Sequence, residues 1–314
     1  LSTLNYVIRR LVNDWKLLLG IFLGIVIAST LVTGAPVYIQ ALEKQGLTTA
    51  IDRAPGVFLD IFMLAPNVPL DAGRMEDADR VIDESVERHI RGLVRGREQY
   101  LRGPTYLAGL PRQPIAEGRR VSRGYMQSLS NLEHHTIFLQ GRMATDKIMP
   151  GPEGPIVEAV LGRPSADVFG ITVGDLVTFT PSLNNRTRVQ AKIVGIFDPT
   201  DPVEDYWQGN ASIFVNPGPL PEAPDIGVEV DPEEPPVAAF VTREALIDGA
   251  GKAFPGTLIT STWMIFIDEE RLKGWPASKS VSRIDSLEEE FVLGLPGAAV
   301  LTGIKALVSD YNKR

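Results

Sequence analysis

Residues 17–37 read LLLGIFLGIVIASTLVTGAPV, and this run decides how the rest of the chain is interpreted. It contains no Asp, Glu, Lys or Arg, and its length is about the 20 residues that a helix needs to cross a bilayer. A buried core helix is usually shorter and has a polar face, while a signal peptide has a shorter apolar region before a small-residue cleavage site. Thr33-Gly34-Ala35 is a weak candidate for such a site. We therefore predict a transmembrane helix over residues 17–38.

Charge sets the orientation of this helix. Arg9, Arg10 and Lys16 precede it against a single Asp14, so the positive-inside rule places the N-terminus in the cytoplasm and the main domain outside the cell membrane. Apolar residues at helical spacing beside the arginines predict that residues 1–16 form a cytoplasmic amphipathic segment on the inner membrane surface. Residues 39–53 remain compatible with a helix, and we expect them to form a helical stalk.

Composition limits the classes of function. The 314 residues carry a net charge of −8, which argues against nucleic acid as a partner. The sequence has no cysteine, so disulfides, thiolate metal sites and cysteine nucleophiles are excluded. The 29 glycines and 24 prolines indicate many turns, as in a β-rich body with irregular connections.

After the stalk the hydrophobic period changes. The run GVFLDIFML at residues 56–64 predicts a strand. Apolar residues three or four apart in 71–94, with charges between them, predict an amphipathic helix that packs on a sheet. Two or three further strands are predicted within residues 97–140. This order indicates an α+β subdomain over residues 54–140.

The next part is richer in strands. Residues 171–180 and 188–197 flank an Asn184-Asn185 turn and predict a β-hairpin. We expect a β-rich subdomain over residues 141–281 and a helical return towards the membrane over 282–314. Other predicted strands are 155–161, 237–241 and 258–267; predicted helices are 165–169 with a Ser cap, 243–253, 282–292 and 298–311; and 217–236 is predicted to be a surface linker. The predicted fold class is thus α+β: one transmembrane helix with a stalk, then a β-rich mixed extracytoplasmic domain of two subdomains.

Several short motifs follow one another in a characteristic order. They are Gly141-Arg142-Met143, a strand at 157–161, Phe169-Gly170-Ile171, Val173-Gly174-Asp175, Val194-Gly195-Ile196-Phe197 and Asp205-Tyr206-Trp207. In this order they resemble the extracytoplasmic domain of FtsX/MacB-like ABC transporter permeases. That family has a GR-x-P turn, a GL-x-VGD turn, a returning V-x-VVGIF strand and an aromatic D-x-YW. Ala144 stands where the family prefers proline, which changes only the stiffness of the turn.

The resemblance implies a MacB periplasmic-domain-like fold and a membrane permease component of an ABC transporter that is not itself catalytic. Its implied partners are a cytoplasmic ABC ATPase subunit, membrane lipid, a second permease copy in a dimer, and lipid-linked or protein cargo. The implied role is to couple ATP hydrolysis to the outer domain for export or mechanotransmission. Such permeases have several membrane helices and this sequence predicts one, so we expect the N-terminal part of a permease.

The residues themselves predict no enzyme chemistry. Residues 249–253, GAGKA, lack both the first glycine of a P-loop and the Ser or Thr after its lysine. His134 and His135 are adjacent, so on a strand their rings point to opposite faces, and His89 lies on a charged helix face. We expect no catalytic residue, no cofactor and no metal site.

Two other interpretations remain open. The chain is alternatively a single-pass, membrane-anchored sensor or protein-binding domain, and an accompanying ATPase would separate this from the permease. An anchored hydrolase is disfavoured because the sequence has no Gly-x-Ser-x-Gly elbow and no His-Glu-x-x-His pair.

Overall fold

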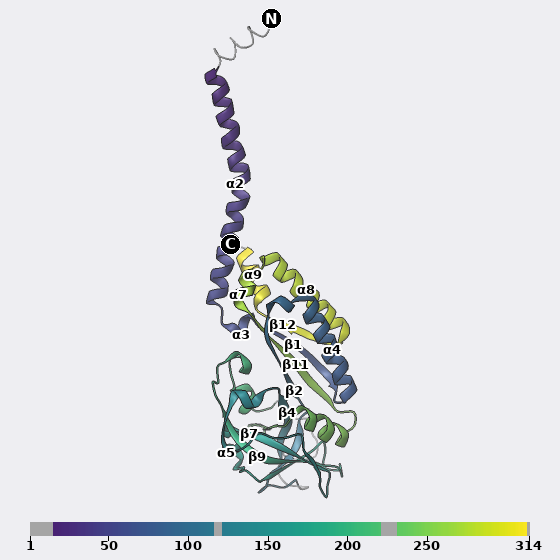
Figure 1. Ribbon diagram of the computed structural model, residues 1–314. Helices are drawn as coiled ribbons and strands as arrows, with labels where there is room; N and C mark the ends of the chain where they lie inside the picture. Colours follow the sequence, from purple (N-terminus) through teal and green to yellow (C-terminus); the bar gives the residue numbers. More distant parts are fainter. Residues whose placement is uncertain (1–14, 116–120, 221–230, 313–314) are drawn as a thin grey trace, which may run out of the picture.

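The computed structural model describes residues 15–115, 121–220 and 231–312 (Figure 1). A long helix, α2 (Trp15–Arg53), projects from a body built on one 12-stranded sheet. The helix ends at Arg53, where the predicted stalk ends, because Pro55 disfavours helical backbone in the residue before it.

Two predicted segments at the N-terminus lie partly or largely outside the described residues. The amphipathic segment at 1–16 lies almost wholly outside the described residues, and so do the side chains at 17–18 and 33–38 of the predicted span. Within the described part of the chain, no helix combines the length and the apolar character that crossing a membrane requires.

The half of the body nearest α2 is an open sheet with helices on one face (Figure 1). α4 (Ala72–His89) and α8 (Ala277–Gly294) pack against each other over this face. The buried side of α4 consists of Met75, Ala78, Ile82, Ser85 and Val86, which confirms the predicted amphipathic pattern. The strands, in spatial order, are β4 (Ser122–Leu129), β2 (Val94–Arg102), β11 (Leu258–Ile267), β1 (Ile61–Pro69) and β12 (Ala299–Leu301).

The far half is a closed ring of strands. The pairings run from β4 through β3, β8, β9, β7 and β10 and then back to β4, because β10 pairs with both β7 and β4. β4 therefore belongs to both halves of the sheet. The other ring strands are β3 (Tyr106–Gly109), β7 (Pro155–Gly162), β8 (Leu176–Thr180), β9 (Val189–Pro199) and β10 (Val237–Phe240), with β5 (Thr136–Gly141) paired to β9 and β6 (Ile148–Pro150) paired to β7.

The predicted hairpin is present as β8 and β9, which pair antiparallel from Leu176 to Phe179. The division at residue 140 stays a prediction, and strand pairing crosses it, since β11 from the second range lies between β1 and β2 from the first. The body thus contains both helices and strands, and strands predominate in its far half.

Four predicted elements differ from the structure. The predicted strand at 56–64 begins as a short helix, α3 (Gly56–Leu59), because the backbone N–H of Asp60 closes a helical turn on the carbonyl of Gly56. The predicted helix 71–94 stops at His89, because Ile90 leaves helical backbone at φ −132° before β2. By contrast, the short helix predicted at 243–253 is confirmed over those residues, and its middle, Ala245–Gly251, is a π-helix.

The third difference lies at the C-terminal side. Residues 298–311 form β12 and then α9 (Ile304–Asn312), because β12 adds to the edge of the open sheet beside β1. The fourth is the helix predicted at 165–169 with a Ser cap: α5 (Arg163–Phe169) starts two residues earlier with a proline in its first turn, and Ser165 is buried inside it. Proline is favoured in the first turn, where its missing N–H costs no hydrogen bond.

Candidate functional site: the stalk junction

The predicted aromatic motif lies in a segment that bridges the two halves of the body. This bridge segment, residues 200–216, contains the helical turn Asp205–Trp207 and α6 (Ser212–Val215). Trp207 is fully buried and Phe214 nearly so. They belong to a second apolar cluster that takes Val160, Phe197 and Phe240 from the ring and Met264 and Phe266 from the open sheet. The bridge segment therefore packs against both halves.

Tyr206 fixes the bridge segment to the turn between β4 and β5. Its hydroxyl donates to the carbonyl oxygen of Ser130 at 2.8 Å, and its ring stacks on the imidazole of His135 at 3.6 Å between centroids. His135 Nδ1 lies 3.0 Å from Glu204 Oε1. Burial raises the pKa of Tyr206 well above its usual range, so its hydroxyl stays protonated and can donate.

One end of the bridge segment reaches the base of α2. Asp205 forms a salt bridge of 2.9 Å with Arg95 of β2, and a Cβ placed on Gly56 would lie 2.8 Å from Asp205 Oδ2. A Cβ on Gly209 would lie 3.5 Å from Val57 Cγ1. The helix base, residues 52–60, thus contacts the bridge segment at two points.

The helix base also contacts the C-terminal part of the chain. The N–H of Gly303 donates to the carbonyl of Phe58 at 2.8 Å, and a Cβ on Gly303 would lie 2.2 Å from the Phe58 ring. Lys273 of α7 (Glu269–Lys273) binds Asp52 at 2.6 Å. α7 and α9 both pack against α2, and Figure 1 shows α9 beside the lower part of that helix. We call this set of contacts the stalk junction.

At the centre of the stalk junction is a buried carboxyl group, Asp60. It is 1% exposed; its Oδ1 accepts the N–H of Ile267 at 2.9 Å, and its Oδ2 has no hydrogen-bond partner among the described residues. Burial raises the pKa of Asp60 to about 7, and Asp205 and Glu269 also act to raise it. Asp60 was not among the residues predicted to be functional, although a lone acid inside the apolar run GVFLDIFML was an available signal.

The GR motif forms a second polar centre, on the ring. Arg142 donates two hydrogen bonds of 2.7 Å to Glu158 of β7, and Thr145 donates its N–H and hydroxyl to the same carboxylate. Glu158 is 6% exposed, and the hydrogen bonds from Arg142 lower its pKa to about 2. The motif therefore ties the turn after β5 to β7.

We expect Glu158→Gln to lower the free energy of unfolding by about 2 kcal/mol at neutral pH, because the amide loses the ion pair and one acceptor. Glu158 has a depressed pKa, so its stabilisation is complete above about pH 4.5 and is lost as the pH falls towards about 2. Urea unfolding of both proteins should show their difference narrowing over that range. Glu153→Gln, at a half-exposed pair with Arg188, is the control. An equal loss of unfolding free energy in that variant would contradict a special stabilising role of the Arg142–Glu158 pair.

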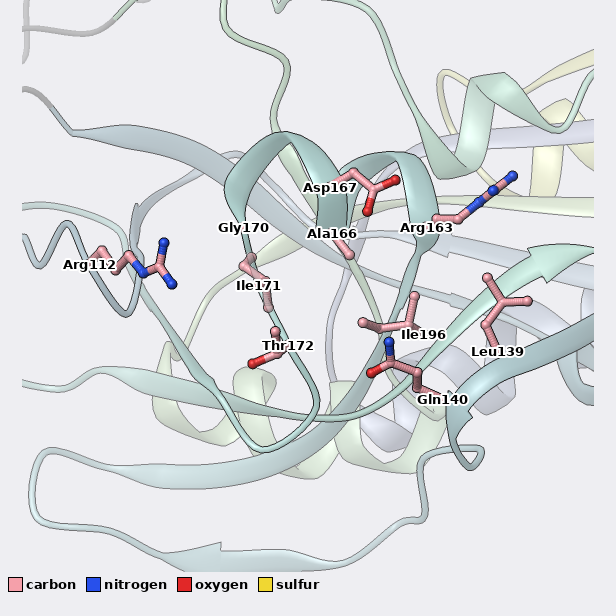
Figure 2. A pocket seen from close by; sticks show the side chains of 10 residues that line it. All are labelled: Arg112, Leu139, Gln140, Arg163, Ala166, Asp167, Gly170, Ile171, Thr172 and Ile196. Atoms are coloured by element: carbon pink, nitrogen blue, oxygen red, sulfur yellow. The ribbon is translucent and has the colours of Figure 1, made fainter.

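A surface cavity of about 340 Å³ lies beside α5 on the ring (Figure 2). Ala166, Ile171 and Ile196 form its apolar part, and Leu139 and Gln140 point into it from β5. Arg112 approaches from the opposite side, while Arg163 extends away and pairs with Asp198 at 3.0 Å. Asp167 is also on the lining, and because Arg163 is paired with Asp198, the charges of Arg112 and Asp167 remain and offset each other.

The three histidines, for which no metal or catalytic role was predicted, have different surroundings. His89 contacts Glu290 at 2.7 Å, His135 contacts Glu204, and His134 lines a different surface cavity from the one in Figure 2. In the described residues, no three His, Asp or Glu side chains come together as a set able to hold a metal ion. Residues 249–253 lie in the π-helix and the turn that follows it, so this GAGKA run is helical and does not form a loop.

The motif fragments are brought together only in part. Gly141-Arg142, β7 and Val194–Phe197 adjoin on the ring, where Gly141 pairs with Gly195 and Val160 pairs with Gly195 from the other side. Asp205-Tyr206-Trp207 lies apart, in the bridge segment. The sequence order did not indicate that this motif touches the helix base, because Gly56, Arg95 and Asp205 are far apart in the chain.

No family model matches the chain, and no curated protein matches it. Among solved structures, the periplasmic region of MacB from Actinobacillus actinomycetemcomitans is similar at 10% identity and a TM-score of 0.42, covering 84% of this chain and 98% of the other. A domain assigned to a permease from Porphyromonas gingivalis is similar at 10% identity and a TM-score of 0.35, covering 78% and 90%. Likenesses this distant carry no argument about function.

Proposed function

We propose that the chain is the non-catalytic permease component of an ABC transporter, with residues 17–38 crossing the cell membrane and the body outside it. The observation that carries the proposal is the stalk junction, where the base of α2 contacts the bridge segment, α7 and the loop before α9. A displacement of α2 would reach both halves of the body through these contacts. A simple anchor needs no such connection.

Two further observations support this function. The described side chains from 19 to 32 are exposed on every side of α2, and an apolar helix without a polar face suits a lipid environment. α9 packs against both α2 and α8, so the two end helices of the described chain lie at the same pole of the body (Figure 1). This arrangement suits a body held and moved through two helices at one end, and the order of motifs in the sequence agrees with it.

The experiment that tests the function is affinity purification of the native full-length product from detergent-solubilised membranes, followed by mass spectrometry. We expect a stoichiometric ATPase subunit and a second copy of the chain. A product that carries no ATPase would overturn the permease and favour a membrane-anchored binding domain.

A disulfide lock would then test the coupling itself. The chain has no cysteine, and a Cβ on Gly209 would lie 4.0 Å from Val57 Cβ, which is within disulfide range. In the purified complex, we expect Val57→Cys with Gly209→Cys to lower ATP turnover at least about tenfold on oxidation, with recovery on reduction. The two single variants are matched controls, and Gly209→Cys alone measures the strain of a side chain at φ +75°. The reduced double variant is the reference for the locked complex, and turnover that oxidation leaves undiminished would contradict coupling at this contact.

A further inference from the structure

The stalk junction contains one ionisable group that its packing does not explain. Asp60 caps the C-terminal end of α3 and lies directly before β1, so it occupies the point where the helix base passes into the sheet. A buried carboxylate normally has donors for both oxygens. Here Ile267 supplies one donor to Oδ1, and Oδ2 is buried with none among the described residues.

The charges around Asp60 do not compensate for this burial. Arg95 of β2 is the cation that acts on it, but the guanidinium is already paired with Asp205 of the bridge segment. Glu269 of α7 adds a further negative charge. Two charged groups on the surrounding elements have partners of their own: Asp52 pairs with Lys273, and Asp268 pairs with Arg271.

An ionised Asp60 would therefore place a second carboxylate next to the Arg95–Asp205 pair, in a site from which water is excluded. A neutral Asp60 keeps its bond from Ile267 and adds no charge. The cost of ionisation is relieved when the helix base moves away and admits water, because a solvated carboxylate is stable.

We propose that the stalk junction is a proton-binding site: Asp60 carries a proton while the helix base is seated, and loss of that proton loosens the helix base from the bridge segment and α7. The proton is exchanged with bulk water as the junction opens, so no other reactant is needed. The inference concerns the junction alone and holds whether or not an ATPase accompanies the chain.

The direction and size of the effect follow from linkage. When the junction opens, the pKa of Asp60 returns from about 7 to its ordinary 3.8. The population of the open junction relative to the closed one therefore increases as the pH rises between these values. Between about pH 6 and about pH 8, the population of the open junction should rise about tenfold and then level off.

Hydrogen-exchange mass spectrometry of the full chain in detergent micelles tests this expectation. After correction for the intrinsic rate, peptides covering residues 55–61 and 265–268 should exchange about tenfold faster at the higher pH, while residues 189–193 in β9 should not change. Asp60→Asn, a neutral analogue of the protonated acid, should exchange slowly at both values. Asp248→Asn, at a half-exposed pair with Lys252 on the π-helix, should keep the response of the unaltered chain.

Equal protection at the two pH values in the unaltered chain, or a response that survives in Asp60→Asn, would overturn the proposal. Should Asp60→Asn fail to fold, the infrared spectrum of the unaltered chain, with carbon-13 in its aspartate carboxyls, decides the matter. One aspartic carboxyl should then remain protonated at about pH 6 and ionise near pH 7, and its absence would refute the site.

Discussion

Trp207→Ala should lower the free energy of unfolding by about 3–5 kcal/mol, among the largest losses that a single substitution in this chain can cause. The indole is fully buried, with ring centroids 4.9 Å from Tyr206 and 5.8 Å from Phe214. Removal of its ring leaves a cavity between residues of the closed ring and residues of the open sheet. We therefore expect the two halves to unfold less cooperatively, in addition to the loss of stability.

Urea unfolding followed by circular dichroism would measure both effects. We expect one sharp transition in the unaltered chain and a broader one in Trp207→Ala, because a contact between the halves is weakened while β4 and the main apolar core still span both. Trp207→Phe should cost much less, since the indole Nε1 has no hydrogen-bond partner to lose among the described residues. Val203→Ala, in the same segment and 69% exposed, should change stability by less than about 0.5 kcal/mol. A transition as sharp as that of the unaltered chain would show that the bridge segment does not contribute to the cooperativity between the halves.

Local pattern was enough to predict many of the strands and helices. The strand 258–267 is β11 to the residue, and the strand 237–241 and the hairpin at 171–197 are present as β10, β8 and β9. These segments have strong alternation or continuous apolar character, so their burial in a sheet depends little on what lies beside them.

Tertiary contacts decided the rest. Residues 56–59 are apolar enough for a strand, yet they turn into α3, because the helix base must pass between Asp205 and Gly303. The closed ring depends on β10 pairing parallel to β4, more than 100 residues earlier in the chain, and nothing in either run specifies that partner. Asp60 likewise looked like an ordinary polar position, since its burial depends on β11, the bridge segment and α7 together.

The GR motif shows how a local signal and a distant contact combine at one residue. Gly141 has φ +73°, a region that only glycine adopts without strain, and a Cβ there would lie 2.0 Å from the carbonyl oxygen of Val194. The neighbouring atoms are backbone, in a strand held between β7 and β5, so they cannot shift cheaply. Gly141 belongs to a motif that was recognised in the sequence, but the reason for a glycine there is its contact with β9, which was not predicted.

We accordingly expect Gly141→Ala to destabilise the chain by at least about 3 kcal/mol, from left-handed backbone strain added to a backbone clash. Thermal unfolding should measure the loss of stability. Hydrogen exchange should show the greatest loss of protection in β5 and at Arg142, which binds Glu158. Gly174→Ala is the matched control, because it has φ +101° but no atom within 4 Å of the added Cβ, so it tests strain without the clash. If the two variants lost equal stability, the clash with Val194 would contribute nothing, and the GR motif would be explained by turn geometry alone.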